Sequence, residues 1–344
     1  MIGKRFFRQA ICLTLIFSTV VQTAEGADKK TVSEQKTVSP QKAVSEQKAV
    51  SERKTSSEQK TGSGQKTGSE RNAVSVEEEA RVVSLAPSNT ELIYSLHGQN
   101  RLVGISSFCL YPPDTKSKEK VGSFVSINWE KLSTLKPSVV VLVSGQEALD
   151  IQLRRHKIKS LVLKNETLED VAKNLITLGA ICGCESEASA LAKRYREAIG
   201  ELNQLFKDTK KSKVFFCVWP KPIVTVGGGS FLNDVVNVCG GENVVSYMRG
   251  SYPKCGPEKV IALQPDVLIM PFESKSIKLT ATPPWSLLSA TKKNQVYFLP
   301  DREHDYLSRP TLRILKGLLP LCLKLHPEKK QELTQWGLKF AQQP

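Results

Sequence analysis

The chain has 344 residues, enough for two domains that each bury a core of their own. Its formal net charge of +15 would by itself suggest an anionic partner. The basic residues are scattered among carboxylates, however, and neither a basic stripe interleaved with aromatic residues nor a nucleic-acid-binding motif is present. The composition therefore argues against a nucleic acid partner and favours a soluble protein whose charges face solvent.

The N-terminus has the layout of a secretory signal peptide. Lys4, Arg5 and Arg8 precede an apolar run over residues 11–21, and small residues follow that run. The run is too short to span a bilayer. We therefore expect residues 1–26 to be removed and the mature chain to be exported.

A hexad repeat follows, beginning KTVSEQ, KTVSPQ and KAVSEQ. Each hexad carries at most two valines and no aromatic residue, so it cannot bury enough apolar surface to offset an ordering entropy of about 1–2 kcal/mol per residue. We predict a disordered tether over residues 27–79. Two explanations of the tether remain open. It is a spacer that lets the folded part reach through the envelope, or it is a repeat expansion without a role.

One stretch of the remaining chain occurs twice. Residues 128–142 are NWEKLSTLKPSVVVL, residues 256–270 are GPEKVIALQPDVLIM, and Glu130 aligns with Glu258. Each copy predicts a short helix, a proline that ends it, and a parallel strand buried on both faces. Two such units indicate two α/β lobes of related build.

Strands alternate with helices at βαβ spacing in both halves of the ordered chain. We predict an N-terminal lobe over residues 80–184 and a C-terminal lobe over residues 209–326, each Rossmann-like. Residues 185–208 carry a helical apolar stripe without proline and predict a single connecting helix, roughly 35 Å long at 1.5 Å per residue. We expect residues 327–344 to form an amphipathic C-terminal extension. The predicted fold class is thus α/β, with two lobes joined by one long backbone helix.

Several local patterns carry more specific predictions. The tetrapeptide Ser88–Glu91 has the spacing of a capping box at a helix start. Residues 227–230, GGGS, lack both dinucleotide-binding and P-loop spacing and predict a tight strand-to-helix turn. A helix is expected around Trp285. No GxSxG or comparable nucleophile context is present, so we expect no enzymatic activity.

The segment DREHDYLSRP, residues 301–310, is predicted to be a loop after a parallel strand. Ligands of open α/β sheets bind outside the carboxyl ends of the strands, where this loop must lie. We therefore expect the loop to contact a ligand, through His304 among others. A polar loop with satisfied hydrogen bonds would explain any single residue equally well. The other three histidines, His97, His156 and His326, are predicted to be surface or helix C-cap residues.

Seven cysteines follow the predicted signal peptide. In an oxidising compartment some of them should pair, and an odd number leaves at least one thiol outside an internal disulfide. Cys182 and Cys184 flank a single glycine, which is neither a CxxC redox motif nor part of a zinc site. The residues alone leave the pairing of five cysteines open: Cys109, Cys182, Cys184, Cys217 and Cys255.

From about Arg81 to Leu325 the chain resembles the periplasmic binding proteins of ABC importers for cobalamin, haem and ferric siderophores, most of all the cobalamin-binding members. The resemblance rests on RVVSLAPSNTELIYSL, GISSFCLYPP, INWEKLSTLKPSVVV, GGGSFLNDVVNVCGGENVV, PEKVIALQPDVLI, and SRP before the last helix of the second lobe. It implies a monomer without a resident cofactor that holds a small-molecule metal chelate between its lobes. The partner would be an importer's permease and ATPase complex, which is also the only link to the membrane.

The resemblance also implies roles for single residues. Glu130 and Glu258 map onto surface carboxylates that dock on permease arginines, although each would also favour the positive end of its own helix. Cys239 and Cys322 match the positions of a disulfide. The candidate ligand-binding residues are Phe108, Tyr111, Phe124, Glu303, His304, Asp305, Tyr306 and Leu307.

Departures from the cobalamin-binding pattern leave the ligand open. Phe108 and Phe124 stand where tyrosine and tryptophan are usual, and His304 lies where the cobalamin-binding members have no histidine. Because His304 or Tyr306 would also suit a haem iron as axial ligand, haem is the alternative to a cobalamin-type corrinoid, together with ferric siderophores. A metal-chelate enzyme on the same fold is a remote alternative.

Overall fold

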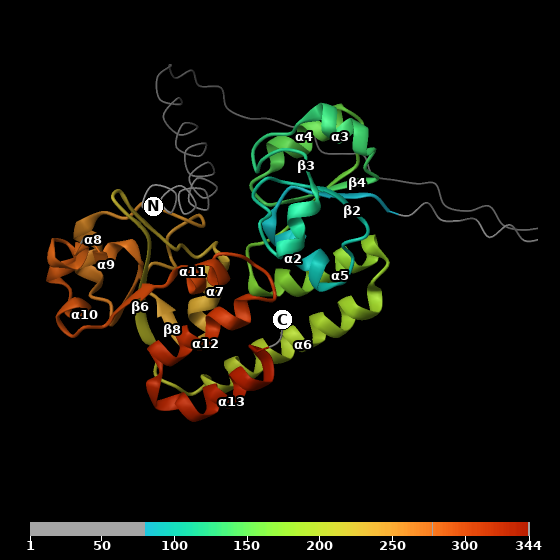
Figure 1. Cartoon of the computed structure of the whole chain (residues 1–344). Coiled ribbons are helices and arrows are strands. Elements are labelled where there is room, and N and C mark those ends of the chain that lie inside the picture. Colours follow the sequence, from blue (N-terminus) through green and yellow to red (C-terminus); the bar gives the residue numbers. More distant parts are fainter. Residues whose placement is uncertain (1–79, 277, 343–344) are drawn as a thin grey trace, which may run out of the picture.

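The computed structural model describes residues 80–276 and 278–342. The predicted signal peptide and hexad tether lie outside these residues. Figure 1 shows two α/β lobes connected by helix α6 (Glu185–Leu205), which confirms the predicted two-lobe fold. The connecting helix ends at Leu205 and not at residue 208.

The first lobe is built on a five-stranded sheet of order β3-β2-β1-β4-β5, in which every pair is parallel. Every residue of the central strand β4 is buried, as predicted for a strand covered on both faces. In chain order the elements are β1 (Val82–Ser84), α2 (Pro87–Ser95), β2 (Leu102–Ile105), η1 (Pro113–Ser117), β3 (Glu119–Lys120), α3 (Trp129–Leu135), β4 (Val139–Val143), α4 (Glu147–Arg155), β5 (Ser160–Leu163) and α5 (Leu168–Cys182).

The second lobe has strand order β10-β9-β6-β7, with β8 also paired to β6. Its sheet is mixed, because β7 returns antiparallel to β6. The elements are β6 (Ser212–Pro220), β7 (Ile223–Thr225), α7 (Phe231–Val238), β8 (Gly241–Asn243), α8 (Pro257–Leu263), β9 (Val267–Pro271), α9 (Glu273–Ser276), η2 (Leu279–Ala281), η3 (Trp285–Leu287), α10 (Ser289–Lys292), β10 (Val296–Leu299), α11 (Asp301–Leu307), α12 (Ile314–Leu325), η4 (Pro327–Lys329) and α13 (Lys330–Phe340).

The two copies of the repeated stretch fold alike. Each forms a helix (α3, α8) followed by a central buried strand (β4, β9). Both helices end in a left-handed residue, Lys136 with φ 43° and Gln264 with φ 38°, directly before the proline. The helix, proline and strand were predicted from the sequence, whereas the left-handed caps were not, because neither residue is the glycine or asparagine usual there.

Three local predictions were wrong. Helix α2 begins at Pro87, whose fixed φ suits the first helical position, so Ser88–Glu91 lies inside the helix and forms no capping box. The predicted loop over residues 301–310 contains helix α11, whose first turn places Asp301 and Glu303 at the positive end of the helix dipole. Trp285 lies in a short 3-10 turn and not in an α-helix.

The glycines of residues 227–229 form the tight turn that the sequence predicted. A Cβ atom on Gly227 or Gly228 would lie 2.2 Å from a backbone carbonyl oxygen, so both positions require glycine. Ser230 then caps α7 by accepting a hydrogen bond from the Leu232 amide.

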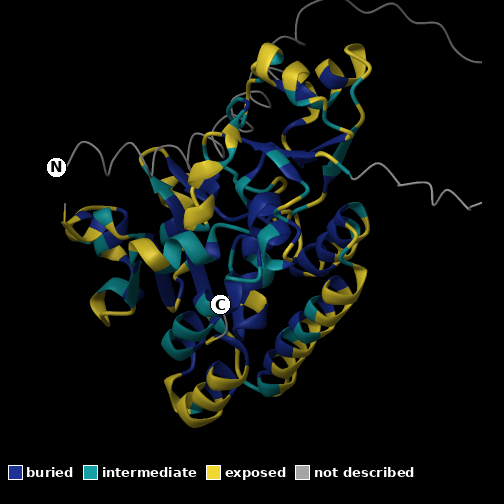
Figure 2. Ribbon diagram, turned by 45° about the vertical axis from the view of Figure 1, so that its right-hand side comes forward, coloured by how far each residue is buried: buried dark blue, intermediate teal, exposed yellow. Residues whose placement is uncertain are grey.

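Helix α6 is held against the C-terminal helix α13. The Trp336 Nε1 donates a hydrogen bond of 2.9 Å to the Ala198 carbonyl oxygen. Leu333, Trp336 and Phe340 are buried, and they share one hydrophobic cluster with residues of both lobes. In Figure 2, buried and exposed residues alternate along α6, whose outer face lies in solvent. None of the helices in the described ranges combines the length and hydrophobicity needed to cross a bilayer.

Candidate functional site

The predicted ligand residues lie in both lobes, next to the carboxyl ends of parallel strands. Phe108 and Tyr111 follow β2, and Phe124 follows β3. In the second lobe, α11 follows β10 directly and carries residues 303–307. This edge of an α/β sheet is the usual place for a ligand, because the strand ends leave a crevice there.

Arg313, which lies just before α12, brings three of these residues together. Its guanidinium carbon lies 4.0 Å from the ring centroid of Tyr111 in the first lobe and 4.9 Å from that of Tyr306 in the second. Asp305 forms an ion pair with Arg313 and another, of 2.9 Å, with Arg309. Aromatic faces attract a guanidinium in this range. The sequence analysis had not singled out Arg313.

A buried carboxylate joins the same cluster from the first lobe. The Oε1 of Glu91 on α2 lies 2.6 Å from Nη1 of Arg309 and 3.3 Å from Nη1 of Arg313. The Glu91 side chain is 3% exposed, and burial raises the pKa of its carboxyl, while the two guanidinium groups oppose that shift. A buried carboxylate needs such cationic partners, so this pair ties the two lobes together beside the predicted cleft.

His304 and Glu303 both lie on α11, but their side chains have different surroundings. Burial lowers the pKa of His304, while the charges of Asp305 and Asp301 oppose the shift. Its ring nitrogens form no hydrogen bond with any described residue, and a neutral imidazole in that state can ligate a metal. Glu303 instead accepts a hydrogen bond from the Tyr297 hydroxyl.

Leu307 differs from the prediction that it contacts the ligand. It is 1% exposed and belongs to the main hydrophobic cluster. A Cβ added to Gly317 of α12 would lie 2.8 Å from Leu307 Cδ2, so the leucine packs closely on that helix. Leu307 therefore anchors α11 to the core and does not line the cleft.

Phe108 and Phe124 are half-buried, and their backbones are held locally. The Phe108 amide donates to Ser106 Oγ at 3.3 Å, and the Phe124 carbonyl oxygen accepts a hydrogen bond of 2.8 Å from Gln146 Nε2. Both residues follow parallel strands of the first-lobe sheet. Their role as ligand contacts stays a prediction.

Five exposed apolar side chains that sequence reasoning had largely missed follow the strands at this edge. They are Leu110, Tyr111, Val125, Tyr247 and Phe272, with exposures of 57, 39, 60, 60 and 44%. We call these five residues the apolar rim. The first three follow β2 and β3, and the other two follow β8 and β9. The sequence signal that could have identified them is an apolar residue shortly after a predicted parallel strand. Of the five residues of the apolar rim, only Tyr111 had been proposed as a ligand contact.

The predicted docking carboxylates occupy equivalent places in the two lobes. Glu130 and Glu258 are both exposed and are each the second residue of their helix, α3 or α8. Figure 1 shows α3 and α8 on different lobes, well apart from each other. At both positions the carboxylate is also stabilised by the positive end of its own helix dipole. A role in the helix and a role in permease docking therefore do not exclude each other.

Cys239 and Cys322 are buried next to each other. Both are 0% exposed, and the Cys322 thiol lies near enough to Cys239 to affect its pKa. Burial raises the pKa of Cys239, and Cys322 raises it further. Both are free cysteines in this structure, and the predicted disulfide between them stays a prediction.

The described ranges contain no group of three or more His, Cys, Asp or Glu side chains arranged to hold a metal ion. A metal that arrives already bound in a macrocycle needs no such group. His304 or Tyr306 would then supply one axial ligand at most.

Known proteins share this architecture. The family model described as periplasmic binding protein matches residues 82–303. The vitamin B12-binding protein of Vibrio parahaemolyticus is 30% identical over 257 residues, which cover 74% of this chain and 92% of that protein.

Two solved structures extend the comparison. The periplasmic vitamin B12-binding protein BtuF of Vibrio cholerae is 27% identical with a TM-score of 0.64, and the match covers 74% of this chain and 99% of that one. The periplasmic heme-binding protein RhuT from Roseiflexus sp. RS-1, at 22% identity and a TM-score of 0.60, covers 72% and 98% and shares the fold. The family model spans the first lobe and most of the second, and the relatives match over nearly their whole length, so the chain belongs to the periplasmic binding protein family.

Proposed function

We propose that this chain captures a cobalamin-type corrinoid in the cleft between its lobes and delivers it to the permease of an ABC importer. The names of the vitamin B12-binding relatives support this ligand class. The signal-peptide pattern of residues 1–26 supports export to the periplasm. On this proposal the protein binds and releases its ligand without chemical turnover.

The observation that carries the proposal is the apolar rim on both lobes. Its side chains are exposed at the edge of each sheet where α/β proteins bind ligands. Covering apolar surface is worth about 25 cal/mol per Å². A broad macrocycle with apolar faces would cover the rims of both lobes at once. Polar groups near α11 would remain available for the amide substituents of a corrin.

Haem is the alternative that a specific observation favours. His304 lies on α11 at the same edge, with a lowered pKa and no hydrogen bond from its ring to a described residue. Tyr306, two residues further on, already packs against Arg313. His304 is therefore the better candidate for an axial ligand, and a ferric siderophore has no comparable support.

Calorimetric titration of the purified protein with cyanocobalamin and, separately, with hemin distinguishes the ligands. We expect micromolar or tighter binding of cyanocobalamin, at about 8 kcal/mol or more of binding free energy. Hemin binding with a shifted Soret band that His304→Gln abolishes, together with no cyanocobalamin binding, would reject the corrinoid. Tyr306→Phe is the matched control, because it keeps the ring against Arg313 and removes only the hydroxyl.

A further inference from the structure

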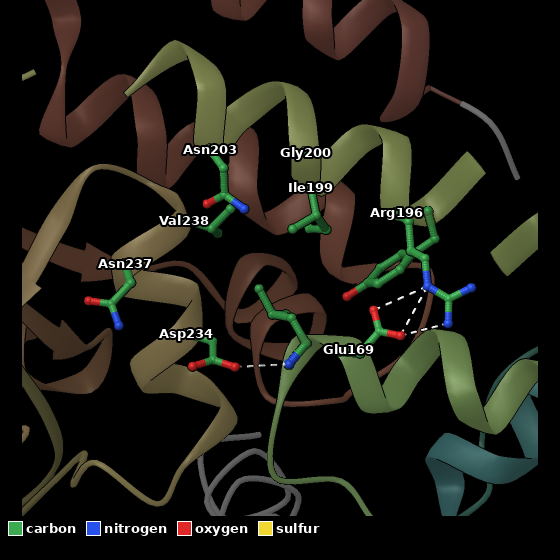
Figure 3. Close-up of a pocket in the computed structure, with 10 residues that line it drawn as sticks. Glu169, Arg196, Ile199, Gly200, Asn203, Asp234, Asn237 and Val238 are labelled. Carbon is green, nitrogen blue, oxygen red and sulfur yellow. Dashed lines mark hydrogen bonds and ion pairs between the residues drawn. The ribbon is translucent and has the colours of Figure 1, made fainter. Parts of the chain in front are cut away.

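A cavity of about 530 Å³ lies apart from the predicted cleft, between the start of α5, the middle of α6 and α7. Figure 3 shows this space, which we call the junction pocket. Its volume falls in the range of about 300–1,000 Å³ that is usual for small-molecule sites. Its walls are formed by Leu168 and Glu169 of α5, by residues of α6 between Tyr195 and Asn203, and by Asp234, Asn237 and Val238 of α7.

Three parts of the protein meet at the junction pocket. Leu168 begins α5 in the first lobe, and its amide donates a hydrogen bond of 3.1 Å to Asp234 Oδ2 on α7 in the second lobe. Tyr195 belongs to the connecting helix α6. A molecule bound here would therefore touch both lobes and the helix that joins them.

Gly200 opens one wall of the junction pocket. A Cβ atom at this position would meet no heavy atom within 4 Å. Glycine inside a helix is less favourable than alanine, and no close packing requires it here. The absence of a side chain instead keeps the space beside α6 free.

The charges of the lining favour a cation over an anion. Arg196 and Glu169 neutralise each other through a forked contact, with 2.6 Å between Nη2 and Oε1 and 3.0 Å between Nε and Oε1, as Figure 3 shows. Asp234 forms no ion pair with any described residue. Burial raises the pKa of the Asp234 carboxyl. The hydrogen bond from the Leu168 amide opposes that shift, and the charge of Asp170 adds to it. A bound cation would relieve this unpaired charge.

A buried hydroxyl without a partner also belongs to this wall. Tyr195 is 1% exposed, and its hydroxyl has no hydrogen-bond partner among the described residues. Leaving such a group unpaired is unfavourable, because its hydrogen bond to water is lost without a replacement. Burial raises its pKa, and the carboxylates of Glu169 and Asp234 add to the shift, so the hydroxyl lies near both acidic groups of the pocket.

We propose that the junction pocket is a second small-molecule site that takes a primary alkylammonium ion. The ammonium group donates its three hydrogen bonds to the Asp234 carboxylate, the amide oxygen of Asn237 and the Tyr195 hydroxyl. The short alkyl chain packs on Ile199 and Val238. Figure 3 shows Asn203 and Ile199 on α6 opposite Asp234 and Asn237 on α7, so the proposed molecule would lie between these two helices.

Titration of the isotope-labelled protein with n-butylammonium chloride, followed by amide NMR, tests the site. We expect saturable shifts of the Leu168 backbone amide and of the Asn203 and Asn237 side-chain amides. The neutral analogue n-butanol should bind at least tenfold more weakly. No saturable shift, or equal binding of the two probes, would overturn the proposal.

Variants test the two walls separately. Gly200→Phe fills the pocket and should abolish binding, whereas Gly200→Ala adds only a methyl group and should leave the affinity within about twofold. Asp234→Asn keeps an acceptor for the Leu168 amide but removes the charge, and it should weaken n-butylammonium at least tenfold. Unchanged affinity in Asp234→Asn refutes the site even if Gly200→Phe fails to fold.

Discussion

Glu91 on α2 and Arg309 before α12 form an ion pair across the two lobes, with 2.6 Å between Glu91 Oε1 and Arg309 Nη1. The two residues are 218 positions apart in the chain. Because the carboxylate is almost fully buried, the pair is sensitive to loss of either member, and it holds the wall of the cleft that carries Tyr111 against the wall that carries α11.

Removal of Glu91 should destabilise the protein strongly. We expect Glu91→Ala to lower the free energy of unfolding by about 3 kcal/mol, since it leaves two partly buried guanidinium groups without their carboxylate in the first lobe. Glu91→Gln keeps the side-chain volume and should lose most of the same energy. Urea denaturation measures both.

The control for Glu91 is a carboxylate in an exposed pair. Glu201, which is 45% exposed, pairs with Lys339 between α6 and α13. Glu201→Ala should change stability by less than about 1 kcal/mol. Equal losses of unfolding free energy in the Glu91 and Glu201 variants would show that the buried inter-lobe pair stabilises the protein no more than an exposed pair does.

Ser160 should make stability depend on pH through Asp150. The Ser160 hydroxyl donates a hydrogen bond of 2.6 Å to Asp150 Oδ1, and this bond, with that from Arg154, lowers the pKa of Asp150 below its ordinary value of 3.8. A lowered carboxyl pKa gives stability that is present above the unfolded-state pKa and is lost as the pH falls through the folded-state pKa. Ser160→Ala should therefore cost about 1 kcal/mol at pH 7.

This difference between wild type and Ser160→Ala should shrink as the pH is lowered below 3.8. Urea denaturation over a pH series measures it. Ser117→Ala is the control, because the Ser117 hydroxyl donates to the Asp114 carbonyl oxygen, which does not titrate. A difference that stays constant with pH would contradict the role of Asp150.

Charge reversal at both docking glutamates should separate binding from delivery. In cells that depend on this protein for corrinoid uptake, Glu130→Arg with Glu258→Arg should abolish uptake, while the purified variant keeps its ligand affinity. Two other exposed carboxylates, Glu187 and Asp208, serve as the matched double reversal. Uptake at the unmutated rate in the first pair would reject the docking assignment.

The apolar rim should contribute to ligand affinity from both lobes. Val125→Ser and Phe272→Ser each remove an exposed apolar side chain, and each should weaken corrinoid binding by about tenfold, or 1.4 kcal/mol. Leu287→Ser is the control, because Leu287 is 47% exposed but lies in η3, away from the strand ends. Calorimetry that gives the same affinity for all three variants as for wild type would exclude the rim as the contact surface.

Cys239 and Cys322 should form a disulfide in the exported protein. Alkylation of the denatured protein without reductant should modify neither cysteine, and a peptide that joins them should separate on reduction. Replacing both by serine should lower stability by about 2–5 kcal/mol. Complete alkylation of both residues before reduction would show that they remain thiols.

The sequence predicted the fold well where the signals are local. The repeated helix, proline and apolar strand of residues 128–142 and 256–270 behave as expected, since helix spacing and strand burial leave a direct pattern in the chain. Local signals failed where one short pattern is compatible with two different helix starts. Ser88–Glu91 has capping-box spacing, but Pro87 starts the helix and Glu91 is used by Arg309 instead.

For the candidate site, the sequence predicted which residues lie near the strand ends but not which side chains contact each other. It placed Tyr111 and residues 301–310 next to strand ends, because parallel strands put all their carboxyl ends at one edge of the sheet. It could not show that Arg313 lies between Tyr111 and Tyr306, or that Leu307 turns into the core. Those facts depend on how the two lobes pack.

The sequence by itself determined the two-lobe plan, the connecting helix and the matched carboxylates Glu130 and Glu258, because each depends on residues close together in the chain. Only the tertiary structure decided that Glu91 joins Arg309 across the lobes and that Gly200 and Asp234 face one pocket. Burial and charge pairing between distant segments arise when the lobes pack on α6, and no short stretch of sequence encodes them.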